Sequence, residues 1–415
     1  MFEPSRRHPQ TLRRLRWPAA RIARLLTGIG VAAAWAGVGV AVAAPFRPTD
    51  DAQVVERLPG AGDAAVRALR RLHAQLANSP DDVKLAVAVA RRDIEIGRGE
   101  ADPRYDGYAE AALGPWIRLP QPPVEVLVLR ASLKQTRHDF PAALADLGAA
   151  LARDPENTQA WLTRAVVLEV EGDYPKALGN CLSLARFADT LLTAICTDGV
   201  MSLSGNARIA YDELQGVLAA APAGESAALR LWASTMLGEM AVRLGNPAAA
   251  EQHFKTALAL GIRDVYLLGA YADFLLDQNR PQDVRSLLQG EVRIDPLLLR
   301  LALAEQRLGA PELGSHTADL AERFAEARMR GDIIHQREEA WFTLDLLHQP
   351  GPALRLALSN WAVQREPVDL RILIRCALAA GEPSTARRGL EWLARSHLQD
   401  PHVGQLTARL QEALK

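Results

Sequence analysis

The chain has 415 residues, of which 49% are hydrophobic, 23% are charged and only 5% are aromatic, a composition that favours helices over sheets. Its formal charge of −1 hides an asymmetry, because residues 1–43 hold seven arginines and one acid. The remaining chain therefore has 41 bases against 48 acids. An acidic body of this kind argues against binding to nucleic acid.

The first 43 residues are typical of an export signal. A basic segment precedes an uncharged apolar run from Leu25 to Ala43, which ends in the A-x-A pattern at 41–43. We therefore predict that residues 1–43 are a signal peptide cleaved after Ala43, and that the protein is periplasmic or secreted. The apolar run is also long enough to span a bilayer. The alternative is an uncleaved inner-membrane anchor that leaves the rest of the chain outside the cytoplasm.

Helical periodicity begins after a predicted linker at 44–62. The segment 64–78 places its apolar residues on one face, and a second helix is expected from Val83 to Ile96. A third helix should end near Trp116, before a proline-rich break. We interpret 63–123 as degenerate N-terminal helical repeats.

From residue 124, two successive segments of 34 residues align with each other. Ala131 aligns with Ala165 and Ala143 with Ala177, so small residues recur at a fixed spacing. A period of 34 is typical of a two-helix unit that buries its apolar face only by stacking on its neighbours. The sequence therefore predicts an all-α fold, a right-handed solenoid of antiparallel helix pairs.

The period weakens after residue 189 and returns at 231. Unit starts are expected at 231, 265, 299, 333 and 367, each 34 residues apart. We therefore predict repeats over 124–230 and 231–401, followed by a capping helix at 402–415 with one apolar side.

The repeated pattern resembles the tetratricopeptide repeat (TPR). One unit carries it in Trp161, Ala165, Tyr174 and Ala177, and another in Gly238, Ala250, Phe254 and Ala257. The whole chain is also similar to uncharacterised exported TPR proteins of Gram-negative bacteria. This resemblance implies a scaffold that binds a protein or peptide in a concave groove lined by the first helix of each unit.

The resemblance also implies which residues line that groove. The family's ligand positions, transferred to this sequence, include Gln135, Gln159, Glu169, Trp232, Glu239, Tyr266, Asp273, Arg337, Arg371 and Arg375. This set is acidic with aromatic residues in the middle and basic towards the C-terminal end, which would suit an extended peptide. Trp232 and Tyr266 are the expected anchors, because aromatic residues dominate binding hot spots. The alternative is that both rings pack between units.

Cys181 and Cys196 are expected on neighbouring helices that fold back between them. In an oxidising compartment we predict a disulfide between them, provided that their Cα atoms come within about 7 Å. The alternative is two buried thiols that fill core positions. Cys376 has no expected partner and is predicted to be buried.

Motifs for catalysis, metal binding or cofactor binding are missing from the sequence. It contains no H-E-x-x-H, C-x-x-C, phosphate-binding loop or G-x-S-x-G pattern. We therefore predict no catalytic residues, no metal site, no cofactor and no enzyme activity. The preferred function is an exported scaffold for a protein or peptide partner in cell-envelope assembly or secretion. The alternative is a membrane-tethered structural subunit of an envelope or polysaccharide-export complex.

Overall fold

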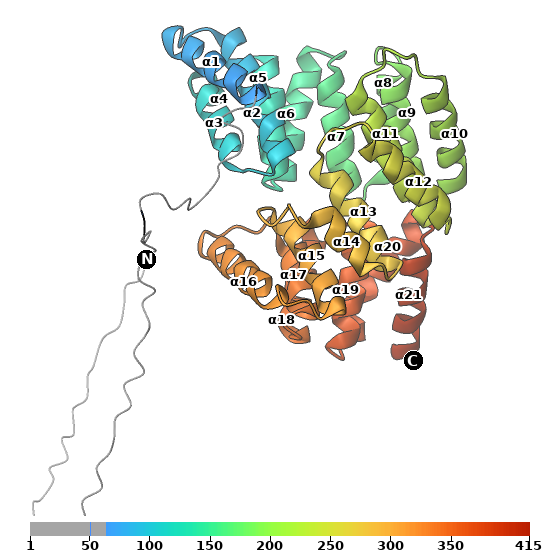
Figure 1. Ribbon diagram of the computed structural model, residues 1–415. Coiled ribbons are helices and arrows are strands. Elements are labelled where there is room, and N and C mark those ends of the chain that lie inside the picture. The colour runs from blue at the N-terminus through green and yellow to red at the C-terminus, as the bar shows by residue number, and fades with distance from the viewer. Residues whose placement is uncertain (1–49, 51–63) are drawn as a thin grey trace, which may run out of the picture. The chain divides into compact units, whose positions relative to one another are not determined.

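The structure is a computed structural model, and it describes Asp50 and residues 64–415 (Figure 1). The predicted signal peptide, its cleavage site and most of the linker lie outside the described residues. The chain divides into two units, Met1–Pro59 and Gly60–Lys415, and the helices belong to the second. Over 64–415 every regular element is a helix, which confirms the all-α prediction. In this part of the chain no helix is both long and apolar enough to cross a membrane.

The helices follow one another as antiparallel pairs. The first are α1 (Ala64–Asn78), α2 (Val83–Glu100), α3 (Arg104–Ala112), α4 (Gly114–Ile117), α5 (Val124–Thr136), α6 (Phe140–Arg153), α7 (Thr158–Val170) and α8 (Tyr174–Leu184). Next come α9 (Thr190–Leu203), α10 (Ala207–Ala220), α11 (Ala227–Arg243), α12 (Pro247–Leu258), α13 (Val265–Asp277), α14 (Pro281–Leu288) and α15 (Asp295–Leu308). The last are α16 (Leu313–Met329), α17 (Gln336–Asp345), α18 (Pro350–Val363), α19 (Pro367–Ala379), the 3₁₀ turn η1 (Pro383–Ala386), α20 (Arg387–Ser396) and α21 (Pro401–Ala413).

Aspartate side chains begin several of these helices. Oδ1 of Asp82 accepts hydrogen bonds from the backbone N–H groups of Lys84 and Leu85, both at 3.0 Å. Asp139 and Asp173 cap α6 and α8 in the same way. An aromatic residue and a proline follow each of these two caps, and proline is tolerated in the first turn because its missing N–H has no partner there. The Asp-aromatic-Pro triplets of the sequence therefore mark where second helices begin.

Left-handed residues end the first helices at the repeat spacing. His138, Gly172, Gly245 and Asn279 all have φ between 54° and 76°. Small residues then let the two helices of a pair approach. A Cβ atom on Gly238 of α11 would lie 2.7 Å from the Phe254 ring of α12, so only glycine fits at that contact.

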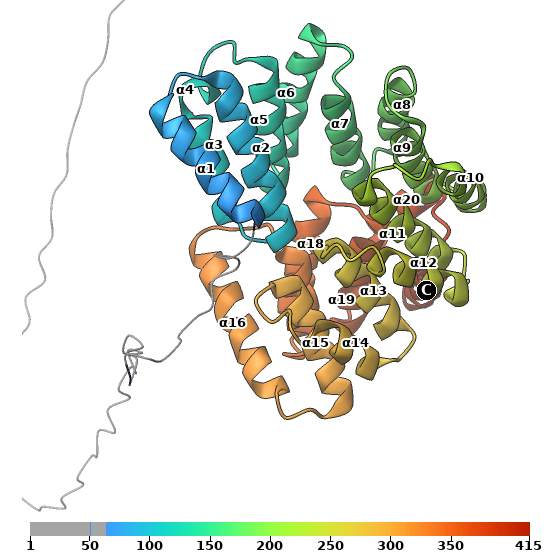
Figure 2. The same ribbon diagram turned by 45° about the horizontal axis from the view of Figure 1, so that its top comes forward.

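The hydrophobic core runs along the solenoid and then joins parts that are distant in sequence. One buried cluster extends from α9 to α17. Another combines residues of α7–α9 with residues of α17–α21. Figures 1 and 2 show the same contact between distant parts of the chain, with α20 lying close to the α8–α12 region. The units therefore pack on their sequence neighbours and also across a full return of the superhelix.

Polar contacts also join units that are distant in sequence. The backbone N–H of Arg365 donates to the carbonyl of Val170 at 2.8 Å, and its guanidinium donates to the carbonyl of Glu171. Elsewhere the Arg263 guanidinium donates to the carbonyl of Gly99 at 2.7 Å. The sequence predicts a concave groove lined by first helices. In the structure, units that are far apart in sequence also contact one another, because small rotations between successive units add up until distant units meet.

A disulfide joins two successive helices. Cys181 of α8 is bonded to Cys196 of α9, and their Cα atoms are 5.4 Å apart. This confirms the predicted pairing. Cys376 of α19 is a free, buried thiol, and burial raises its pKa to about 12.

Candidate functional site

The inner side of the solenoid carries a group of carboxylates beside one exposed tyrosine. We call Glu169 of α7, Glu239 of α11, Tyr266 of α13 and Glu366, which precedes α19, the acidic patch. Tyr266 is 60% exposed, and its hydroxyl donates a hydrogen bond to Oε1 of Glu239 at 2.8 Å. Three of the four residues are among the groove positions that the TPR resemblance implied.

The carboxylates of the acidic patch act on one another. Desolvation raises the pKa of Glu169 to about 8, and the negative charges of Glu366 and Glu239 add to this rise. The pKa of Glu239 and the pKa of Glu366 are also raised, in both cases chiefly by desolvation. Tyr266 is open to solvent on one side, yet surrounding protein and Glu239 raise its pKa well above the usual value. Glu366 is paired with Arg337, whereas Glu169 and Glu239 have no ion pair among the described residues.

Two polar side chains next to the patch each have one buried atom without a hydrogen-bond partner. Arg243 of α11 opposes the raised pKa of Glu169 and of Glu239, and its Nη2 donates to the Ser202 hydroxyl at 2.8 Å. Its Nε is buried and makes no hydrogen bond. The hydroxyl of Tyr174 is likewise buried without a partner, and its pKa is raised chiefly by this burial and further by the charge of Glu169. Polar groups in this position are not fully satisfied by the protein itself.

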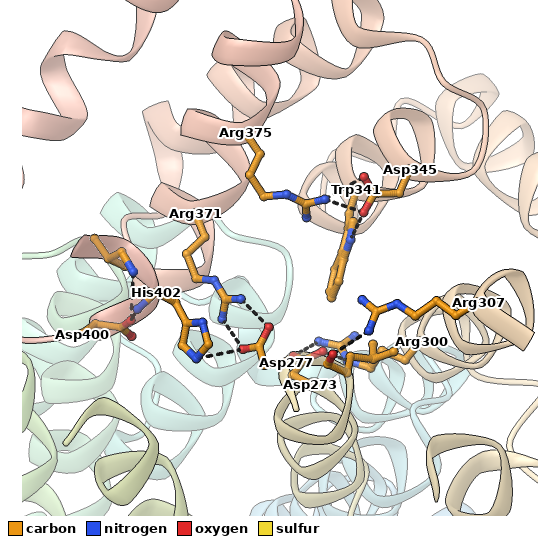
Figure 3. Close-up of polar contacts among 12 residues, drawn as sticks. Asp273, Asp277, Arg300, Arg307, Trp341, Asp345, Arg371, Arg375, Asp400 and His402 are labelled. Carbon is orange, nitrogen blue, oxygen red and sulfur yellow. Dashed lines mark hydrogen bonds and ion pairs between the residues drawn. The ribbon is translucent and has the colours of Figure 1, made fainter. Parts of the chain in front are cut away.

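The C-terminal part of the inner side is neutralised by ion pairs (Figure 3). Arg371 of α19 makes two hydrogen bonds to Asp277 of α13, at 2.9 and 2.7 Å. Arg375 contacts Asp345 at 2.7 and 2.6 Å. The sequence predicts that the C-terminal end of the groove is basic. In the structure this end carries no excess of positive charge, because the superhelix brings acidic residues opposite these arginines.

Ion pairs also occupy two further residues that were predicted to line the groove. Asp273 accepts two hydrogen bonds from Arg300, at 2.7 and 2.6 Å. Arg337 pairs with Asp369 at 2.7 Å and also with Glu366. Both pairs belong to the protein's own network, so a partner that used these residues would have to compete with it.

The aromatic candidates differ in exposure. Trp232 is partly buried against the large core cluster, whereas Tyr266 presents its ring to solvent. Trp341, near the ion pairs, donates from Nε1 to Asp345 at 2.7 Å and lies under the Arg300 guanidinium at 5.4 Å (Figure 3). Of the two expected anchors, Tyr266 is the one whose ring is open to a ligand.

The two glutamine candidates lie on the N-terminal units. Gln135 of α5 is partly exposed, and Gln159 of α7 is exposed and donates to the Thr163 hydroxyl at 3.0 Å. They lie on helices that precede those of Glu239 and Tyr266 in the stack. Their part in binding stays a prediction, as does that of the whole set.

Sequence reasoning missed Glu366, Arg243 and Asp277. Arg243 follows Glu239 by four residues, one helical turn, so helical spacing could have found it. Asp277 lies one position beyond the family's groove positions in its unit. Glu366 lies in the connection before α19, and no periodic signal marks it.

Metal binding finds no support in the described side chains. Over 64–415 no group of three or more histidine, cysteine, aspartate or glutamate residues is arranged to hold a metal ion. The expected lack of a cofactor and of catalytic residues stays a prediction.

These features define a class: helical-repeat scaffolds that stack antiparallel helix pairs into a solenoid. Residues 128–189 and 235–297 match the model of the tetratricopeptide repeat. The chain therefore contains tetratricopeptide repeats over these two segments. Proteins of this kind are in general non-catalytic scaffolds for protein–protein interaction. No curated protein matches the chain.

Several solved helical structures are similar to the chain at low sequence identity. A tetratricopeptide repeat protein from Parabacteroides merdae is 15% identical, with a TM-score of 0.36 over 61% of this chain and 98% of that one. A Rap protein complexed with competence and sporulation factor is 13% identical, with a TM-score of 0.43 over 84% and 97% of the two chains. Yeast Tom70 is 13% identical, with a TM-score of 0.38 over 84% and 85%. Identities this low say nothing about partners.

Proposed function

We propose that the protein is an exported scaffold that binds a protein or peptide partner on its inner side, in cell-envelope assembly or secretion. The basic and apolar leader at 1–43 supports export, and the repeat architecture supports binding rather than catalysis. The observation that carries the proposal is the acidic patch, where carboxylates with raised pKa values surround an exposed tyrosine.

The chemistry of the acidic patch favours a basic segment of the partner. A lysine or arginine side chain placed between Glu169 and Glu239 would supply the positive charge that the patch lacks. The same side chain could lie over the Tyr266 ring, a contact that favours cations. Ion pairs already occupy the arginines further along the inner side, so an acidic partner has fewer open positions there.

The test compares partners captured by three forms of the full chain from envelope extract. The first is wild type, and the second carries Glu169→Gln, Glu239→Gln and Tyr266→Ala. The matched control carries Glu322→Gln, Glu412→Gln and Tyr108→Ala; it removes the same groups from exposed positions, with Tyr108 51% exposed.

We expect at least one protein to be crosslinked to wild type and to the control through a lysine- or arginine-rich segment, and to be lost from the patch variant. Mass spectrometry of the crosslinks identifies that segment. Identical partner lists for all three forms would contradict binding at the acidic patch.

The alternative function, a membrane-tethered structural subunit, differs in the fate of the leader. Intact-mass measurement of the protein from fractionated cells shows whether residues 1–43 are still attached. Loss of 43 residues from material in the soluble envelope fraction supports the exported scaffold. A full-length mass found only in the inner-membrane fraction supports the tethered subunit instead.

A further inference from the structure

A second charged site lies between α3, α4 and α5, three helices near the blue, N-terminal end of the ribbon in Figures 1 and 2. An open cavity of about 560 Å³ occurs there. This volume falls within the range of pockets that bind small molecules, roughly 300–1,000 Å³. None of the residues of the acidic patch lines it, so it is a separate site.

Four cationic side chains line this cavity: Arg118, Arg130, Lys134 and Arg137. Two carboxylates lie among them. Glu110 pairs with Arg137, and Asp146, behind the cavity wall, is shared by Arg130 and Lys134. Four cations against two carboxylates leave two positive charges in excess.

The inner cations are held in place by the fold. Arg130 donates to both oxygens of Asp146, at 2.8 and 2.6 Å, and to the carbonyl of Ile117. Lys134 donates to the same carboxylate at 2.7 Å. Arg130 and Lys134 lower the pKa of Asp146 against the effect of its burial, so the carboxylate stays ionised and anchors both cations. Cations positioned before binding lose little side-chain entropy when an anion arrives.

The outer cations keep donors for a ligand. Arg137 is bonded to Glu110 through Nη2 alone. Arg118 is exposed at the cavity edge, and the structure records no partner for its guanidinium among the described residues. The exposed Ala111 and the edge of the largely buried Leu133 add a small apolar surface to the lining. The cavity thus combines forked donors, a positive excess of two and a small apolar wall.

We propose that this cavity binds a small organic dianion of the phosphomonoester type. The phosphate group would lie between Arg118, Lys134 and Arg137, because guanidinium forks match the geometry of phosphate oxygens. A phosphomonoester carries about −1.5 to −2 charges at neutral pH, which matches the excess of the site. Its organic part would lie on Ala111 and on the accessible edge of Leu133.

Isothermal titration calorimetry at low ionic strength tests this on the full chain, with phenyl phosphate, inorganic phosphate and benzoate as the probes. We expect phenyl phosphate to bind saturably with one site per chain. Inorganic phosphate should bind more weakly, because it lacks the apolar ring. Benzoate, with a single charge, should bind roughly tenfold more weakly than phenyl phosphate or worse.

The variant Arg118→Gln/Arg137→Gln should lose roughly tenfold or more in affinity for phenyl phosphate, since it removes the exposed donors. The matched control is Arg208→Gln/Arg388→Gln, which removes two exposed arginines from α10 and α20 and should leave the affinity unchanged. The single variant Arg118→Gln, at a side chain without a recorded partner, guards against an effect on folding. It should lose part of the affinity at an unchanged melting temperature.

Three results would overturn the proposal. The first is a lack of saturable binding of phenyl phosphate to wild type, and the second is an equal loss of affinity in the control variant. The third is binding of benzoate as tight as that of phenyl phosphate, because a dianion site must discriminate against a single charge.

Discussion

At Gly172 an unusual backbone conformation coincides with a close neighbour. Its φ of 76° is one that L-amino acids with a side chain rarely adopt. A Cβ atom there would also lie 2.5 Å from Nε1 of Trp392 and 3.1 Å from Cβ of Arg365. Trp392 is itself buried, so it has little room to move. This glycine therefore serves both the end of α7 and the contact between distant units.

We predict that Gly172→Ala lowers the free energy of unfolding by about 2–4 kcal/mol, from backbone strain and overpacking together. The matched control is Gly381→Ala, which has a φ of 69° but no atom within 4 Å of its Cβ position. It should cost only the backbone strain, about 1–2 kcal/mol. Urea unfolding of the two variants measures the difference, and equal losses would show that the contact with Trp392 is unimportant.

Glu169 gives the fold a pH dependence. Its pKa is raised from the ordinary value of 4.5 to about 8. Between these two pH values the folded state therefore keeps a proton on Glu169 that the unfolded state has released. Its favourable contribution to stability is complete below about pH 4.5 and is lost as the pH rises towards 8. We predict that the melting temperature of wild type falls over this window more steeply than that of Glu169→Gln. Parallel melting curves against pH would contradict a raised pKa at Glu169.

α8 and α9 show how a covalent bond fixes the angle between two helices. Their connection, near residues 185–189, reverses the chain, and the disulfide lies on the buried side of both helices. The bond closes a loop with a sequence separation of 15. It therefore restricts the unfolded chain as well as the folded helix pair.

We predict one reactive thiol per chain in denaturant without reductant, and three after reduction. Reduction should lower the free energy of unfolding by up to about 3 kcal/mol, the value expected for a loop of this length. Cys376→Ala provides the control, because it removes the free thiol and leaves the disulfide intact. In that variant the unreduced count should fall to zero. Three thiols in the unreduced denatured protein would contradict the disulfide.

Across the whole described solenoid, ion pairs join units that are far apart in sequence. Arg371 and Asp277 are 94 residues apart, and their side chains are only 26% and 19% exposed. His402 of α21 also approaches Asp277, at 3.7 Å (Figure 3). Such contacts connect distant units across part of the inner side and occupy arginines that would otherwise be available to a partner.

We predict a coupling free energy of about 1–3 kcal/mol between Arg371→Ala and Asp277→Ala in a double-mutant cycle, because the pair is charged and partly buried. The exposed pair Arg208 and Asp212, at 3.7 Å within α10, is the control and should give less than about 0.5 kcal/mol. Urea unfolding of the single and double variants supplies both values. A coupling free energy near zero for Arg371 and Asp277 would mean that this ion pair does not stabilise the contact between α19 and α13.

The candidate site was only partly accessible from the sequence. Glu169, Glu239 and Tyr266 occupy periodic positions, so the family's pattern placed them on first helices. Glu366 lies in the connection before α19, and it comes close to Glu169 only because the superhelix brings distant units together. The repeat period predicts which units are neighbours in the stack. It does not predict which distant unit comes to lie opposite a given unit, because that depends on the sum of several small rotations.

Sequence alone determined the helix pairs, because small residues, aspartate caps and left-handed turns act within a few residues of one another. It also predicted the pairing of Cys181 with Cys196, since one short connection separates their helices, and the structure decided between a disulfide and two buried thiols. Tertiary structure alone decided which charges remain uncompensated on the inner side. That outcome depends on the summed twist of many units, which brings Asp277 to Arg371 and leaves Glu169 and Glu239 short of positive charge.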